Sequence, residues 1–172
     1  MQDGGARLDI TENGDSTHRE GAEKLISELD EPVTLQLFFA ETALEKFGRN
    51  QTQDLLVYAD YVRQLVRRFA QASEGKVKVE QFDPLPLSNA EANADNLGIQ
   101  RSPLNRENTE AFYHGLAVVG DRGKREVIPA LFPRAVPVEE LEYRIAELLE
   151  RVTKEDRSTV GILSSLPLFG TM

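Results

Sequence analysis

The sequence predicts an α/β domain with a mixed central sheet between layers of helix. A buried strand, a long amphipathic helix and a second strand follow one another between Val33 and Phe82, and this βαβ order is typical of a parallel strand pair. An apolar segment followed by the turn residues Asp121-Arg122-Gly123-Lys124 predicts an antiparallel hairpin over 112–128. Hydrophobic residues make up 40% of the chain and charged residues 28%, which is ordinary for a globular protein.

The N-terminal part is predicted to be a loose segment followed by a short helix. Residues 1–16 are rich in Gly, Asp and Asn, with a short strand expected at most over 8–11. Thr17-His18-Arg19-Glu20 has the pattern of a capping box, in which the threonine and the glutamate satisfy free N–H groups at a helix start. The amphipathic helix that follows must end before Pro32. We therefore expect the domain to cover residues 17–153.

The first strand and its crossover helix have the clearest periodicity. Residues 33–37 alternate between apolar and polar, and Phe38 and Phe39 make both faces apolar at the strand's end, which predicts a strand that becomes fully buried. After a loop through Gly48-Arg49-Asn50, apolar residues recur at three- and four-residue steps up to Ser73. Gly75 is suited to end that helix, and 77–82 is the next strand.

The second half repeats the alternation of helix and strand. Ser88 is expected to cap a short helix over 89–97 that ends at Gly98, and a final helix is expected over 138–152 after the hairpin. Residues 154–172 are interpreted as a linker and the first strand of a second α/β domain that is missing here. Exposed strands recruit partners, so residues 158–172 are expected to self-associate with a neighbouring copy.

Composition excludes several classes of function. The formal net charge is -9, which disfavours nucleic acid and anionic membrane surfaces as direct partners. The best basic cluster, Arg63, Arg67 and Arg68, is interpreted as a solvated helix face. The chain has no cysteine, which excludes thiol nucleophiles, disulfide exchange and thiolate metal sites. No run approaches the roughly 20 apolar residues of a membrane span, but an anchor could lie beyond either end of this sequence.

No residue pattern indicates catalysis, a cofactor or a metal. His18 is interpreted as a surface residue of the capping box and His114 as a strand-edge residue. The carboxylates at Glu28, Asp30 and Glu31, and at Glu139, Glu140 and Glu142, are interpreted as solvated residues of helix ends, where acidic groups favour the helix dipole. Phe38, Phe39, Phe112 and Tyr113 fit either a groove or ordinary packing between adjacent strands.

The order β-α-β-α-β-β-α over 33–152 resembles that of a thioredoxin-like fold, in three layers. Residues 37–40 resemble the end of the first core strand of thioredoxins, and residues 98–104 resemble the segment before their cis-proline. Residues 41–46 hold no Cys-x-x-Cys, so the resemblance implies a binding groove without chemistry. Its residues would be Phe39, Ala40, Glu41, Thr42, Ser102, Pro103 and Leu104. The resemblance raises the expectation of a cis Ser102–Pro103 bond above the base rate, and the nine residues from Leu104 to Phe112 weaken the analogy.

Several segments together resemble the auxiliary component of gliding-motility-type ABC transporters. They are Arg7-Leu8-Asp9-Ile10-Thr11-Glu12, Glu28-Leu29-Asp30-Glu31-Pro32-Val33-Thr34, Gly75-Lys76-Val77-Lys78-Val79 with Asp83-Pro84, Arg125-Glu126-Val127-Ile128-Pro129, and Val160-Gly161-Ile162-Leu163-Ser164-Ser165-Leu166-Pro167. Asn13 to Thr17 departs from the family, because its usual aromatic helix start is replaced by polar residues. The resemblance implies a non-catalytic binding or scaffolding module on the periplasmic side of the bacterial inner membrane. It also implies membrane anchors beyond this chain and a permease and an ATPase as partners.

Two alternatives remain open. A cysteine-independent enzyme of glutathione-transferase-like type would need an activating hydroxyl beside the end of the first strand, where Thr42 is the sole candidate, and a companion helical domain. A solute-binding protein would need two lobes and a cleft, for which the chain is short.

Overall fold

The computed structural model describes residues 22, 24–27, 29–47, 49–103 and 111–154. Within them lie a five-stranded mixed sheet and its helices, which confirms the predicted α/β class. Most strand bounds match the sequence prediction to within a residue. The strands are β1 (Val33–Phe39), β2 (Val77–Phe82), β3 (Arg101–Pro103), β4 (Ala111–Gly120) and β5 (Arg125–Ile128), and the helices are α2 (Glu41–Phe47), α3 (Arg49–Ala72), α4 (Asn89–Leu97) and α5 (Val138–Thr153).

The sheet is ordered β2-β1-β4-β3, and β5 also pairs with β4. β1 and β2 are parallel with Val33 opposite Val77, as the crossover between them predicted. β4 is antiparallel both to β1, with Phe39 opposite His114, and to β5. The expected hairpin over 112–128 is therefore confirmed, and β1, with one parallel and one antiparallel neighbour, joins the parallel pair to the antiparallel part of the sheet.

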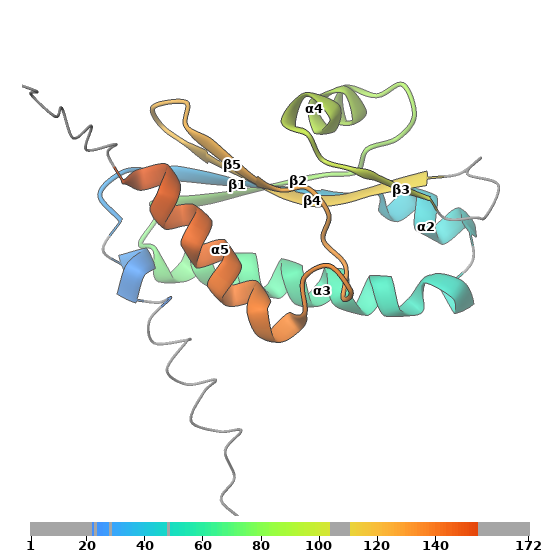
Figure 1. Ribbon diagram of the computed structural model, residues 1–172, viewed down its shortest axis with the longest axis horizontal. Coiled ribbons are helices and arrows are strands. Elements are labelled where there is room, and N and C mark those ends of the chain that lie inside the picture. The colour runs from blue at the N-terminus through green and yellow to red at the C-terminus, as the bar shows by residue number, and fades with distance from the viewer. Residues whose placement is uncertain (1–21, 23, 28, 48, 104–110, 155–172) are drawn as a thin grey trace, which may run out of the picture.

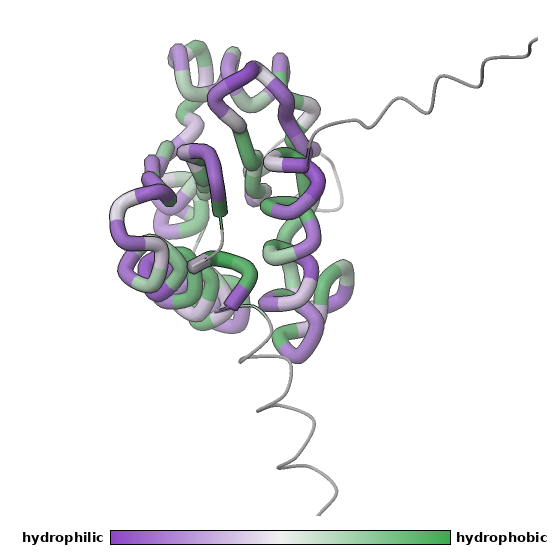
Figure 2. Tube along the Cα trace, turned by 90° about the vertical axis from the view of Figure 1, so that its left-hand side faces the viewer, coloured by the Kyte–Doolittle hydropathy of each residue, from purple (hydrophilic) through white to green (hydrophobic). Residues whose placement is uncertain are grey.

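Helices cover both faces of the sheet. Figure 1 shows α4 on one face and the long α3 with α5 on the other, while α2 lies beyond the end of β1. Figure 2 shows the helical turns as alternating hydrophilic and hydrophobic bands, as expected of helices with one buried face. The main core lies between α3, α5 and the sheet; the largest buried side chains in it include Leu35, Leu65, Leu116, Leu141 and Ile145.

A smaller core lies under α4, where Phe38, Ala94, Ile99, Tyr113 and Ala117 pack together. The helix is capped as predicted: the Ser88 side chain accepts from the N–H of Glu91, and Gly98 adopts a left-handed φ of 80°. β4 approaches this layer closely at Gly115, since a Cβ there would lie 2.8 Å from Ile99 side-chain atoms and 2.9 Å from the Ile128 carbonyl.

The element order differs from the predicted β-α-β-α-β-β-α at two places. The segment expected to be a loop after β1 forms α2, because Leu44 is buried while Glu41 and Lys46 suit the two helix ends. Residues Arg101–Pro103 form the short strand β3, which pairs with the start of β4. Neither element has enough residues to show a period of its own in the sequence.

Parts of the predicted ends lie outside the described residues. Residues 24–27 are helical and Ile26 and Leu29 are buried, in agreement with the expected N-terminal helix. The capping box at 17–20, the segment 1–16 and the strand and self-association expected within 155–172 lie outside the described ranges. No described helix is both long enough and apolar enough to cross a membrane.

Candidate functional site

The candidate site lies where β1 and β2 end side by side. Because the two strands are parallel, their carboxyl ends meet at one edge of the sheet, where open α/β sheets commonly bind ligands. The chain leaves β1 at Phe39 and enters α2 at Glu41. Ala40 between them is fully buried, and its N–H donates to the Tyr113 carbonyl at 3.0 Å. The start of α2 is thereby held against β4.

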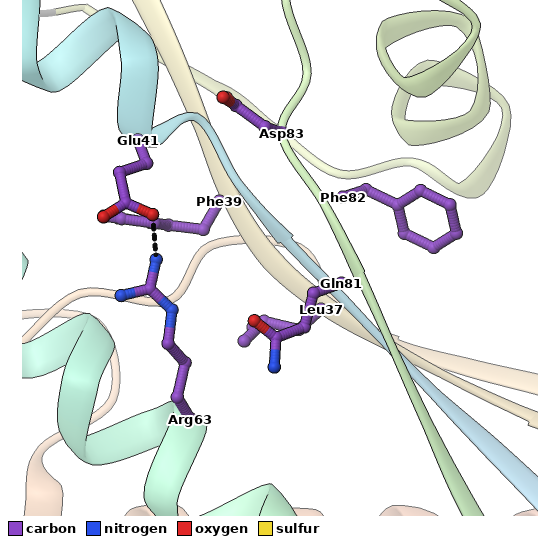
Figure 3. Close-up of a pocket in the computed structure, with 7 residues that line it drawn as sticks. All are labelled: Leu37, Phe39, Glu41, Arg63, Gln81, Phe82 and Asp83. Atoms are coloured by element: carbon purple, nitrogen blue, oxygen red, sulfur yellow. Dashed lines mark hydrogen bonds and ion pairs between the residues drawn. The ribbon is translucent and has the colours of Figure 1, made fainter.

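Arg63 is the central charge of the site. It rises from α3 and donates through Nη2 to Glu41 and through Nη1 to Asp60, each at 2.7 Å, as Figure 3 shows for Glu41. Its guanidinium also lies 4.8 Å from the centroid of the Phe39 ring, within the range of a cation–π interaction. Only 16% of the side chain is exposed. Residues of α2, α3 and β1 therefore all contact this one arginine.

Thr42 and Asp83 form a second link between α2 and the end of β2. The Thr42 hydroxyl donates to Asp83 Oδ2 at 2.5 Å. The other carboxylate oxygen, Oδ1, is buried and has no hydrogen-bond partner within the described residues. The hydroxyl that an enzyme at this position would have to activate is therefore directed at a carboxylate.

Two open cavities border these side chains. One of about 140 Å³ is lined by residues that include Leu37, Phe39 and Phe82, and Figure 3 shows Leu37 and Gln81 on the Arg63 side of the strands and the Phe82 ring on the other side. The second, of about 360 Å³, lies between α3 and β2 and has a polar lining. Its six lining residues are Glu41, Asp60, Arg63, Gln64, Arg67 and Gln81.

His114 lies behind the site. The sequence placed it at a strand edge, and this was wrong: it is on the central strand β4 and 1% exposed. Both ring nitrogens lack hydrogen-bond partners within the described residues, and the ring contacts Phe39 and Tyr58 edge-on at 4.8 and 5.8 Å. Burial, with a smaller contribution from the Arg63 charge, lowers the pKa of His114 to about 3, so the imidazole is neutral at physiological pH.

The residues of the predicted groove fall into two groups. Phe39, Ala40, Glu41 and Thr42 lie together at the end of β1. Ser102 and Pro103 belong to β3 and pair with Phe112 and Ala111 on the opposite side of β4, so a strand separates the two groups. The Ser102–Pro103 bond is trans, since the described residues contain no cis peptide bond. The expectation of a cis bond was therefore wrong, and Leu104 lies outside the described residues.

Sequence reasoning missed Arg63, Gln81 and Asp83. Arg63 was interpreted as part of a solvated face, which holds for Arg67 and Arg68 but not for Arg63. The one available signal was its position next to Val62, on the border of the apolar stripe of α3. Glu142 was also expected to be solvated, but it is 9% exposed and lies 3.8 Å from Arg68. Across the described residues no cluster of His, Asp or Glu is arranged to hold a metal ion.

One family model matches the chain. Its description is "Domain of unknown function (DUF7088)", and it covers residues 12–119, which include β1, α3, β2, α4 and almost all of β4. No curated protein and no solved structure matches the sequence.

Proposed function

The chain belongs to the DUF7088 family of domains of unknown function, and we propose that it is a non-catalytic binding or scaffolding module of an ABC transport system. In this proposal the module stands on the extracytoplasmic side of the bacterial inner membrane. Anchors beyond this chain hold it there, and its partners are the permease and the ATPase. The motif series from Arg7 to Pro167 that resembles the gliding-motility auxiliary component supports this assignment.

We further propose that the domain has a thioredoxin-like fold. The strand order β2-β1-β4-β5, with one parallel pair followed by two antiparallel pairs, supports it. So does the placement of helices on both faces of the sheet. The short strand β3 and the separate helix α2 are additions to the expected β-α-β-α-β-β-α order.

One observation carries the non-catalytic part of the proposal. At the end of β1, where thiol enzymes of this kind place their nucleophile, Glu41 is paired with Arg63 and Thr42 is bonded to Asp83. Both side chains act as ties between α2 and its neighbours. A hydroxyl nucleophile needs a base within reach, and among the described residues Thr42 has the Asp83 carboxylate alone for this, because the imidazole of His114 is enclosed in the core.

Association with a transporter is tested by co-purification. The full-length protein is tagged, expressed together with a candidate permease and ATPase from the same organism, extracted in mild detergent and purified through the tag. We expect both subunits to elute in fixed ratio, and an unrelated permease–ATPase pair to be lost on washing. Recovery of the protein without either subunit, from cells shown to express both, would contradict the proposal.

A further inference from the structure

Among the described residues β2 is the outer strand of the sheet, and one of its edges has no strand paired to it. β1 is the sole strand paired with β2 among the described residues. The N–H of Val33 donates to the carbonyl of Lys76 at 2.8 Å, which sets the phase of this parallel ladder. Backbone groups of successive residues in a strand point alternately to the two sides, so Lys78, Glu80 and Phe82 face β1.

Val77, Val79 and Gln81 consequently direct their backbone groups outward. The N–H of Val77 is satisfied within the molecule, since it donates to Ser73 Oγ at 2.9 Å. No hydrogen bond between described residues reaches the outward N–H and C=O groups of Val79 and Gln81. An open edge of this kind is a template on which an extended segment can pair.

The cavity of about 360 Å³ gives this edge a chemical preference. It lies between α3 and β2, and the side chain of Gln81 reaches it from the strand. Arg63 in its wall is already bonded to Glu41 and Asp60. Arg67, one helical turn further on, is exposed and has no ion-pair or hydrogen-bond partner among the described residues. The wall holds two carboxylates, which share Arg63, and two guanidiniums, so its formal charges balance; Arg67 is the charged group of the wall that has no partner among the described residues.

We infer that the open edge of β2 binds an extended segment of a partner protein that places an acidic side chain in this cavity, against Arg67. Side chains of an added strand alternate between the two faces of the sheet, so every second one points toward α3. An acidic group there gains a charge-assisted hydrogen bond, while a basic one meets Arg67 and is repelled. On the other face, Lys78 is paired with Glu80 at 2.6 Å, which discourages unspecific pairing of purely apolar strands.

This inference rests on the proposed function and names the surface through which the module would hold a partner. The two can fail separately. If the peptide experiment below fails while the transporter subunits co-purify, another surface makes the contact. If the peptide binds as expected and the subunits do not co-purify, the edge is a docking site and the assignment to a transporter is wrong.

The test uses short synthetic peptides of alternating threonine and valine, with glutamate, glutamine or lysine at the centre. Binding to the full chain is followed by amide chemical shifts in titrations. We expect the largest shifts at Val79 and Gln81, and an affinity about tenfold higher for the glutamate peptide than for the lysine peptide. Arg67→Gln should remove this preference, and N-methylation of the peptide along one edge should abolish binding.

A matched pair of variants tests the backbone contact. Gln81→Pro removes the outward N–H and spares the ladder to β1, whereas Gln81→Ala removes the side chain alone. We expect Gln81→Pro to lose peptide binding and Gln81→Ala to keep most of it, with unchanged far-ultraviolet circular dichroism. If Gln81→Pro does not fold, the N-methylated peptides decide the question.

Three results would overturn the inference. The first is equal binding of the glutamate and lysine peptides, and the second is shifts that map to β5 instead of β2. The third is slow amide exchange at Val79 and Gln81 in the free protein, which would mean that the edge is already paired. A concentration-dependent dimer abolished by Gln81→Pro would identify a second copy as the occupant and replace the proposed partner.

Discussion

The guanidinium of Arg63 lies 4.8 Å from the centre of the Phe39 ring. This contact joins the middle of α3 to the last residue of β1, and the same guanidinium holds Glu41 at the start of α2. The junction is therefore built around one arginine that has no freedom to serve as an anion site. Arg63 instead fixes the geometry of the sheet end at which the two cavities open.

Replacement of Arg63 by methionine should destabilise the domain. Arg63→Met keeps the apolar stem but removes two ion pairs and the cation–π contact. Because Glu41 and Asp60 are partly exposed, we expect a loss of about 1–2 kcal/mol in the free energy of unfolding. Arg67→Met, one turn away on the same helix, is the matched control and should change stability by less than about 0.5 kcal/mol. Urea unfolding of both variants measures the difference, and equal effects would contradict the central place given to Arg63.

Stability should depend on the protonation of His114. Its pKa is about 3 in the folded protein, against about 6.5 in an unfolded chain. The unfolded state therefore binds the proton first as the pH falls. Above about pH 6.5 the ring is neutral in both states, so His114 does not make stability depend on pH. Between about pH 6.5 and 3 the free energy of unfolding falls as the pH falls, by at most about 1.4 kcal/mol per pH unit.

His114→Leu is the variant that isolates this effect. Both imidazole nitrogens lack partners, so replacing the ring by an apolar side chain breaks no hydrogen bond between described residues. We expect the variant to be as stable as the wild type at pH 7.5 or more so, and relatively more stable at pH 5. Denaturant unfolding at the two pH values measures this. An unchanged difference between variant and wild type would show that His114 is not buried in its neutral form.

Leu87 is held in a conformation that suits glycine. Its φ is +64° and its side chain is fully exposed, so the backbone strain is not offset by packing. Leu87→Gly should stabilise the domain by roughly 0.5–1 kcal/mol, after allowance for the greater freedom of glycine in the unfolded chain. Leu87→Ala removes the same exposed side chain and keeps the Cβ, so thermal unfolding should show no gain. A gain in both variants would assign the effect to the side chain and not to the backbone.

The sequence predicted the fold far better than the site, for physical reasons. Periodicity of burial in 33–39 and along α3, and the turn residues after β4, are local signals, and the elements they predicted are present. The side-chain hydrogen bonds of Arg63 to Glu41 and of Thr42 to Asp83 are long-range, because each joins segments about twenty to forty residues apart. No local sequence pattern predicts such bonds. The analogy to the cis-proline of thioredoxins placed Pro103 beside the end of β1, and this was wrong. Pro103 belongs to β3, which pairs with β4 and is too short to show a period in the sequence.

The central proposal is that the end of β1 does not catalyse, and turnover with glutathione tests it most directly. The cysteine-independent enzyme is the alternative that the lack of thiols does not exclude, and Thr42 is the hydroxyl it would use. We expect the purified chain to conjugate glutathione to a chloronitrobenzene acceptor no faster than buffer, and Thr42→Val to be indistinguishable from the wild type. Turnover well above buffer that Thr42→Val abolishes, while its unfolding curve stays close to that of the wild type, would contradict the account.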